Sequence, residues 1–367
     1  MKRKDDILLV VYIVLLVAVI AQGQWAGAAD ESHLQTDSGT RLTGLLHNED
    51  CTDFFYTQAF PPGKAGEITD RYVDVIAGAG VTVLFCNTNA RRTNYRSDVW
   101  EAFWDGYDPD GPDDQPFLAP IPQTNRRQFR NLTHNMLEVH RQGVDYPARI
   151  IQRCRHHGVS PWISLRMNDV HFNDNLAHPF HGDLWRKPEL FRQGHPGYYA
   201  RGLDYAHAEV RRHYRALIVE TLQRYDIDGL ELDFMREPYL FSKGEEQARG
   251  EILTQWLCEI RTLVEEASAR RGHSIRVGVR VPSEPETALG LGLDAPTWAQ
   301  EGLVDLVVAT PRWRTMHFDI PLRRWRKLLG DRVTLAGGLE SRCQPHPAAP
   351  VRHMDPECAV GAAVAVL

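Results

Sequence analysis

The chain has 367 residues, of which 43% are hydrophobic and 25% charged, and 42 Lys and Arg against 48 Asp and Glu give a formal net charge of -6. This composition excludes disordered, collagen-like and multi-span membrane proteins. A slightly acidic chain also lacks the clustered positive charge that binding to phosphates requires, so no nucleic-acid partner is expected. The length fits two ordinary domains or one large α/β barrel.

The first 29 residues predict a secretory signal peptide. Three basic residues at positions 2–4 precede an apolar run from Ile7 to Ala21, and the small residues that follow allow cleavage after Ala28 or Ala29. An uncleaved N-terminal membrane anchor is the alternative, because the apolar run is long for a signal peptide. We therefore expect a secreted or periplasmic protein, with residues 30–40 as a linker, residues 41–367 as the folded domain, and membrane contact only through an uncleaved leader.

The cysteines predict no metal or cofactor site. They are Cys51, Cys86, Cys154, Cys258, Cys343 and Cys358, and they show neither CxxC nor Cys/His ligand spacing. Most are expected to be small buried side chains. Only Cys343 and Cys358 are close enough in sequence to suggest a local disulfide in an exported protein.

Short runs rich in Val, Leu and Ile alternate with amphipathic stretches from Leu42 onward. The predicted strands are Leu42–Leu46, Val81–Cys86, Pro161–Met167, Gly229–Phe234, Ile275–Val281, Val304–Ala309 and Val333–Ala336. The clearest predicted helices are Ala206–Tyr225 and Glu245–Ala267. Repeated alternation of strand and helix favours a parallel (β/α)8 TIM barrel, and no phosphate-binding glycine motif supports an open nucleotide-binding sheet.

The eighth strand–helix unit of such a barrel is missing from the pattern. About thirty residues follow the seventh predicted strand, and Ala359–Leu367 has the composition of the beginning of a seventh helix. We therefore expect a barrel that is incomplete at its C-terminus, with the edges of the first and seventh strands exposed.

The fourth predicted strand carries two acidic residues on one face. Alternation along a strand directs Leu230, Leu232 and Phe234 outward to the helices, and Glu231 and Asp233 inward. Carboxyl groups at such positions are costly unless they are paired or used. Functional groups of βα barrels lie at the C-terminal ends of the strands, so Asp233 is placed where chemistry is expected.

The segment Asp228-Gly229-Leu230-Glu231-Leu232-Asp233-Phe234 resembles the fourth-strand motif of α-amylase-type and α-galactosidase-type glycoside hydrolases. It is also similar to the chitinase motif, but Met235 stands where the chitinase acid Glu would be. Together with segments 87–95, 164–171 and 203–207, the chain looks like uncharacterised secreted bacterial glycoside-hydrolase-like barrels over Leu42 to Glu340. This resemblance implies that Asp233 is a catalytic carboxylate; the alternative is an ion-paired aspartate at a strand end.

Glycoside hydrolysis needs a second carboxyl group, ~5 Å away for retention of configuration or roughly 6.5 to 9.5 Å for inversion. The candidates, all near the ends of predicted strands, are Glu340, Glu284, Glu286, Asp169, Glu49 and Asp50. Glu284 and Glu340 are favoured, because each follows its strand by a few residues and could reach the mouth of the barrel.

Several other polar residues at strand ends are candidates for substrate binding. They are His47, Asn48, Asn87, Asn168, Asp169, His171, Glu231, Arg166, Arg236 and Arg280. Arg91 and Arg92 also lie near a strand end. Guanidinium groups bind carboxylates and sulfates, so an anionic polysaccharide is one candidate substrate, whereas pairing with internal acids such as Glu231 explains the arginines equally well.

Aromatic residues in long loops are further candidates. Trp104, Trp185 and Trp313 could stack on sugar rings or pack within their own loops. The insertion from Asn87 to about Gln142 is far longer than usual and is expected to form one wall of a cleft. No triad of metal ligands follows from the histidine spacing.

The sequence thus predicts a glycoside hydrolase with a carbohydrate substrate, neutral or anionic, and no cofactor. Two alternatives stay open. One is a noncatalytic carbohydrate-binding barrel, expected if no acid lies within ~10 Å of Asp233. The other is a metal-assisted hydrolase, expected if His47, His171 and an acid converge.

Overall fold

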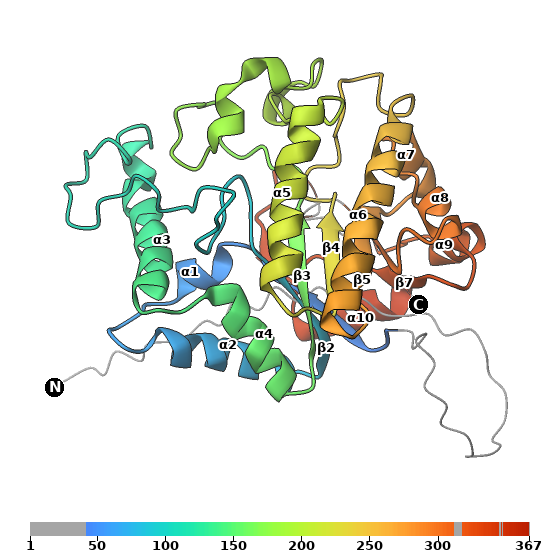
Figure 1. The fold of residues 1–367 in the computed structure, drawn as a ribbon, viewed down its shortest axis with the longest axis horizontal. Helices are drawn as coiled ribbons and strands as arrows, with labels where there is room; N and C mark the ends of the chain where they lie inside the picture. Colours follow the sequence, from blue (N-terminus) through green and yellow to red (C-terminus); the bar gives the residue numbers. More distant parts are fainter. Residues whose placement is uncertain (1–41, 312–317, 345, 347, 367) are drawn as a thin grey trace.

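A computed structural model describes residues 42–311, 318–344, 346 and 348–366. Seven parallel strands form one sheet, in which each strand pairs with its neighbours in sequence. The strands are β1 (Leu45–Asn48), β2 (Val81–Asn87), β3 (Ser160–Arg166), β4 (Gly229–Asp233), β5 (Arg276–Pro282), β6 (Leu306–Thr310) and β7 (Thr334–Gly337). The sheet curls into an incomplete barrel with the long helices packed on its outer face (Figure 1).

Helices connect the strands. They are α1 (Asp53–Thr57), α2 (Ala65–Gly78), α3 (Gln123–Arg141), α4 (Tyr146–His156), α5 (Ala208–Arg224), α6 (Gly250–Arg271), α7 (Pro285–Gly290), α8 (Ala295–Gln300), α9 (Leu322–Leu329) and α10 (Pro356–Val366). Three single-turn 3-10 helices, Asp183–Arg186, Pro188–Leu190 and Gly197–Tyr199, lie in the long connection between β3 and α5. The strands predicted from the sequence are all present, shifted by up to three residues, which confirms the incomplete (β/α) barrel.

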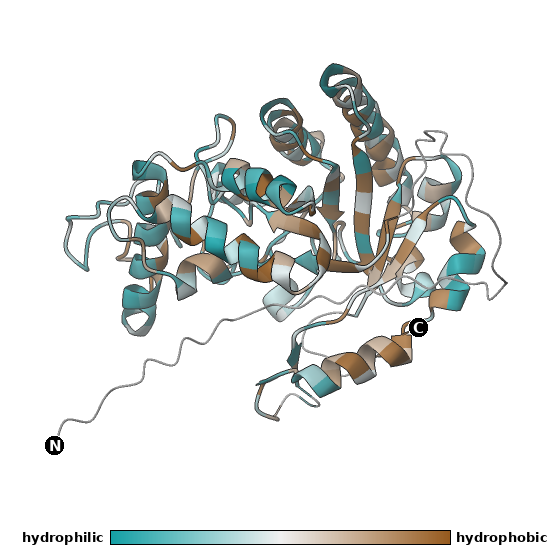
Figure 2. Cartoon of the chain, turned by 90° about the horizontal axis from the view of Figure 1, so that it is seen from below, coloured by the Kyte–Doolittle hydropathy of each residue, from teal (hydrophilic) through white to brown (hydrophobic). Residues whose placement is uncertain are grey.

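The residues after β7 agree with the prediction that the eighth strand–helix unit is missing. Within the described residues, no eighth strand joins β1 to β7. A short antiparallel pair, β8 (Arg342–Cys343) and β9 (Arg352–His353), is followed by α10. Figure 2 shows that α10 is largely hydrophobic, and it leaves Val360 and Val364 exposed at 64% and 68%.

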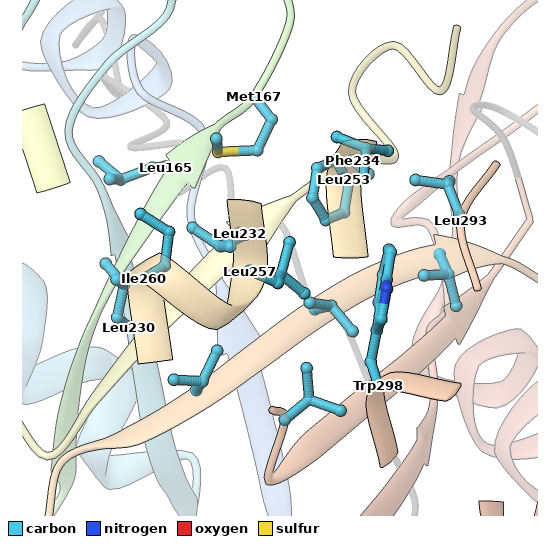
Figure 3. Close-up of a cluster of buried hydrophobic side chains, with 14 of the residues drawn as sticks. Leu165, Met167, Leu230, Leu232, Phe234, Leu253, Leu257, Ile260, Leu293 and Trp298 are labelled. Atoms are coloured by element: carbon cyan, nitrogen blue, oxygen red, sulfur yellow. The ribbon is translucent and has the colours of Figure 1, made fainter. Parts of the chain in front are cut away.

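The outer face of the sheet carries the largest hydrophobic core. Leu230 and Leu232 of β4, and Phe234 directly after it, point toward α6 and α8, as their alternation predicts (Figure 3). They pack in one cluster with Leu257 of α6 and Trp298 of α8, all of them almost completely buried. The alternate positions of β4, Gly229, Glu231 and Asp233, therefore face the interior of the barrel.

Trp162 fills the interior of the barrel below the polar groups. Its indole lies over Gly229 of β4 and Gly278 of β5, and a Cβ atom at Gly278 would lie 2.9 Å from the ring. It packs with Leu46 and Ala336, from strands at opposite ends of the sheet. The two glycines are needed because any side chain there would occupy the space of the indole.

Three sequence predictions concern other parts of the chain. The predicted local disulfide is wrong: Cys343 and Cys358 are free thiols, and the Sγ of Cys343 lies 3.7 Å from the carbonyl oxygen of Arg352, across β8 and β9. The predicted signal peptide and Trp313 lie outside the described residues. No helix in the part of the chain that the structure describes is long and apolar enough to cross a membrane.

Gly229→Ala should lower the free energy of unfolding by about 1 to 3 kcal/mol, because the new methyl group overlaps the Trp162 indole. Urea unfolding measures the difference. Gly78→Ala in α2 is the matched control, since no atom lies within 4 Å of the added carbon. The control should be neutral or stabilising by up to about 1 kcal/mol. Equal stability of the two variants would show that Trp162 does not fill this space.

Candidate functional site

The register of the sheet aligns polar side chains in two interior layers. Residues Arg166, Asp233 and Arg280 lie side by side on β3, β4 and β5. One layer deeper, Ser164, Glu231 and Gly278 are aligned in the same way. The upper layer therefore places one carboxylate between two arginines at the carboxyl edge of the sheet, where barrel proteins carry their functional groups.

Arg280 links two carboxyl groups. Its Nη1 donates to the Asp233 Oδ2 at 3.0 Å, and its Nη2 lies 3.9 Å from the Glu340 Oε1. The other Asp233 oxygen accepts the backbone N–H of Met235 at 2.9 Å. Because one planar guanidinium contacts both, the two carboxyl groups lie within roughly 9 Å of each other. This separation is compatible with the carboxyl pair of a glycoside hydrolase.

Glu340 follows β7 and is the more accessible member of the pair. Its side chain is 21% exposed and lines a pocket, whereas the Asp233 side chain is 4% exposed and is not among the lining residues. Burial raises the pKa of Glu340 above its ordinary value, against the opposing charge of Arg280. The negative charges of Asp233 and Asp50 add to the rise. A carboxyl group with a raised pKa in a pocket is suited to general acid catalysis.

Glu231 lies beneath this pair and is completely buried. The sequence allowed either substrate binding by Glu231 or pairing with a barrel arginine, whereas its Oε2 accepts a hydrogen bond of 2.6 Å from the Nδ2 of Asn48. Burial raises the pKa of Glu231 to about 8, with Asp233 adding to the rise and Arg280 opposing it. Glu231 is therefore mainly protonated at neutral pH and serves as a neutral hydrogen-bonding group.

The pocket beside Glu340 has a volume of about 250 Å³ and two different walls. The polar wall comprises Asp50, Thr52, Asp53, Arg91, Arg166, Asp169, His171, Arg236, Glu340, Ser341 and Arg342. The apolar wall comprises Tyr56, Ala90, Phe103, Phe129, Leu132, Phe172 and Phe180. Phe103, Phe129 and Leu132 belong to the long insertion after β2, which confirms that this insertion forms a wall of the cleft.

Arg166 joins two further acids of the polar wall. Its Nη2 donates to the Asp50 Oδ2 at 2.6 Å and its Nη1 to the Asp169 Oδ2 at 3.3 Å. Burial alone would raise the pKa of Asp50, but Arg166 and Arg236 lower it well below its ordinary value. Asp50 is thus an ionised carboxylate, and the cation of Arg166 is used internally, as the alternative interpretation of the arginines expected.

Asp169 also orients His171. Its Oδ1 accepts the backbone N–H of His171 at 3.0 Å and lies 2.9 Å from the imidazole Nδ1. The imidazole Nε2 lies 3.1 Å from Arg236, which is always a donor, so Nε2 is the acceptor and Nδ1 carries the proton. Burial lowers the pKa of His171, and this keeps the ring neutral at neutral pH.

Arg91 has a different environment from the other arginines. It is 2% exposed, and its Nε lies 3.6 Å from the Asp169 Oδ1. Its Cζ lies 5.2 Å from the ring centre of Phe172, a cation–π arrangement. Phe172 itself has a left-handed backbone, with φ 61°, which is rare for a residue with a bulky side chain and is common at functional sites. Burial lowers the pKa of Arg91 to about 10, so it keeps its charge at neutral pH.

Several predicted site residues lie elsewhere. Glu284 occupies the position before α7, where its half-exposed carboxylate pairs with Arg324 at 3.2 Å, and it does not line the pocket. Asn87 and Asn168 are buried and donate to backbone carbonyl oxygens, Asn87 to Ser164 at 3.0 Å. His47 is buried in β1, and this lowers its pKa to about 4. None of these four residues lines the pocket, and Glu284, Asn87 and Asn168 contact other parts of the protein.

The two predicted tryptophans that the structure describes, Trp104 and Trp185, are also structural. Trp104 and Trp185 are 4% and 0% exposed, and the Trp104 ring stacks on His140. Phenylalanines form the apolar wall instead, and sequence reasoning did not select them, because nothing local distinguishes them from core residues. Asp53 and Arg342, 3.6 Å apart on the polar wall, were also missed. The position of Asp53 just after β1 was the available signal.

The two predicted histidines do not form a metal site with an acid. His171 is held by Asp169, while His47 is buried in the sheet. Within the described residues, no group of three or more His, Cys, Asp or Glu could hold a metal ion.

No protein-family model matches the sequence, and the comparison with curated proteins finds no match either. The chain is similar in structure to a noncanonic maltogenic alpha-amylase AmyB from Thermotoga neapolitana, at 10% identity and a TM-score of 0.35, over 72% of this chain and 48% of that one. It is similar to alpha-L-fucosidase isoenzyme 2 from Paenibacillus thiaminolyticus, at 14% identity and a TM-score of 0.39, over 88% and 48%. The third example is the PgaB (BpsB) glycoside hydrolase domain from Bordetella bronchiseptica, at 11% identity and a TM-score of 0.41, over 75% and 76%.

The chain spans about half the length of the first two of these structures. The structure of this chain defines an incomplete (β/α) barrel with a charged pocket at the carboxyl edge of its sheet.

Glu231→Gln should change how stability depends on pH. The folded pKa of Glu231 is about 8 and its ordinary value is 4.5, so the wild type loses stability relative to the variant as pH rises between these values. The free energy of unfolding should fall by up to about 1.4 kcal/mol per pH unit relative to the variant, measured by urea unfolding from pH 5 to 9. Glu284→Gln, at a half-exposed position, is the control. Parallel curves for wild type and Glu231→Gln would contradict the raised pKa.

Proposed function

We propose that the protein is a glycoside hydrolase in which Glu340 is the general acid and Asp233 is its carboxylate partner. The observation that carries this proposal is the Arg280 guanidinium, which holds both carboxyl groups at the carboxyl edge of the sheet. Each of the two groups has a distinct environment, as acid–carboxylate pairs require. A carbohydrate substrate and export through the N-terminal leader are part of the same proposal.

In the proposed reaction, a sugar ring enters the pocket along its phenylalanine wall. The protonated Glu340 donates its proton to the glycosidic oxygen while the bond from that oxygen to the anomeric carbon breaks. The positive charge that develops on the ring is stabilised by the Asp233 carboxylate, which acts either as the nucleophile, forming a glycosyl ester that water then hydrolyses, or as the base for a water molecule. Asp233 is 4% exposed and does not itself line the pocket, so either role requires the ring or the water to reach beyond the pocket lining. Arg280 keeps Asp233 in place, and Glu231 and Asn48 support the layer below it.

Asp50 is a second candidate for the carboxylate partner. It lines the pocket with Glu340, is ionised through Arg166, and contributes to the raised pKa of Glu340. Substitution of each carboxylate therefore identifies which of them takes part in catalysis.

Cleavage of a panel of neutral, uronic and sulfated glycans tests the proposal. Glu340→Gln and Asp233→Asn should each reduce the rate at least about 100-fold, because each removes an acid–base or nucleophilic group. Glu284→Gln is the matched control and should stay within about twofold of the wild type, since Glu284 pairs with Arg324 outside the pocket.

Circular dichroism should show that the variants are folded. Glu340→Gln should disturb the fold less than Asp233→Asn, because the Glu340 side chain is partly exposed. An unchanged rate for Glu340→Gln would refute the acid assignment. Loss of activity in Asp50→Asn but not in Asp233→Asn would transfer the partner role to Asp50. Binding of glycans without cleavage by the wild type would favour the noncatalytic alternative.

A further inference from the structure

We propose that Arg91 forms a subsite for an oxyanion, a carboxylate or a sulfate group, carried on the sugar ring that occupies the pocket. The inference rests on the proposed function for the sugar. It goes beyond that function because it assigns a charged substituent and the residue that binds it.

The first observation is the unused hydrogen-bonding capacity of Arg91. Its side chain is 2% exposed, and no residue in the described part of the chain accepts a hydrogen bond from its buried Nε and Nη1 atoms. Buried donors are nearly always paired, and an unpaired charged donor is costly. Since Arg91 lines the pocket, a ligand is the missing acceptor.

The second observation is that the nearby acids are already used. Asp169 is 3.6 Å from the Arg91 Nε, beyond hydrogen-bonding distance, and its oxygens accept hydrogen bonds from His171 and Arg166. Asp50 accepts hydrogen bonds from Arg166 and Thr52. These carboxylates lie closer to Arg166 than to Arg91, so Arg91 has an ion pair at 3.6 Å but, among the described residues, no hydrogen-bond acceptor for its Nε and Nη1, and an external anion can supply one.

The third observation is the surface next to Arg91. The Phe172 ring lies under its guanidinium, and Phe129 is in edge contact with Phe172, with ring centres 5.3 Å apart. Phe180 in turn contacts Phe129 at 5.4 Å. An apolar wall beside a buried guanidinium fits a ring with one apolar face and one anionic substituent, which a planar fork can bind through two parallel hydrogen bonds.

Binding titrations of the full-length Glu340→Gln protein test this subsite without turnover. The probes are three oligosaccharides: one of glucuronic acid, one of sulfated galactose and one of neutral glucose. At least one anionic probe should bind more tightly than the neutral probe. Adding Arg91→Gln should weaken that binding at least about tenfold and leave the neutral probe unchanged, because a charge-assisted hydrogen-bond pair is lost.

Arg324→Gln is the matched control, since Arg324 pairs with Glu284 and Glu286 outside the pocket, and it should change neither affinity. Arg91→Lys keeps the charge but not the fork, so it should show an intermediate loss, and it serves in place of Arg91→Gln if that variant does not fold. The uronic and sulfated probes distinguish the two sources of the oxyanion.

Equal affinity for neutral and anionic probes, or unchanged anionic affinity in folded Arg91→Gln or Arg91→Lys, would overturn the subsite. These results differ from failure of the proposed hydrolase, which would appear as absence of cleavage by the wild type with anionic binding intact. Binding that depends on Arg91 would therefore support the subsite whether or not the chain cleaves the probe.

Discussion

The ion pair between Arg280 and Asp233 is the interaction on which the site depends. Three carboxyl groups, those of Glu231, Asp233 and Glu340, lie around this one buried guanidinium. The positive charge of Arg280 opposes the rise in pKa that burial causes at Glu231 and Glu340. One layer below Arg280, its strand carries Gly278, where a side chain would occupy the space of the Trp162 indole.

In the pocket, a second guanidinium, that of Arg166, also pairs with two buried or partly buried acids. Arg166 holds Asp50 and Asp169 as Arg280 holds Asp233, so the two arginines on β3 and β5 are largely neutralised by internal acids. Arg91 lies in a loop rather than on a strand and contacts a carboxylate only at 3.6 Å. Position in the sheet thus separates structural arginines from the arginine proposed to bind a ligand.

Much of the fold and part of the site could be predicted from the sequence. Alternation along β4 correctly predicts which side chains face the helices, and the paired register then brings Arg166, Asp233 and Arg280 together. Spacing alone does not separate Glu284 from Glu340. Both follow a strand closely, but Glu284 begins α7 directly and is drawn to Arg324, whereas Glu340 extends into the pocket. The phenylalanine wall is assembled from segments far apart in sequence, so no local pattern reveals it.

In the proposed reaction, burial beside Asp233 keeps Glu340 protonated enough to act as an acid. The most direct measurement is the titration of the Glu340 carboxyl group, by ¹³C NMR with Glu340→Gln for assignment, in the wild type and in Asp233→Asn. We expect a pKa above 4.5 in the wild type and a lower one in Asp233→Asn, because the variant loses a negative charge that opposes ionisation. A wild-type pKa at or below 4.5, or a pKa that does not change in Asp233→Asn, would show that Glu340 is not the acid proposed here.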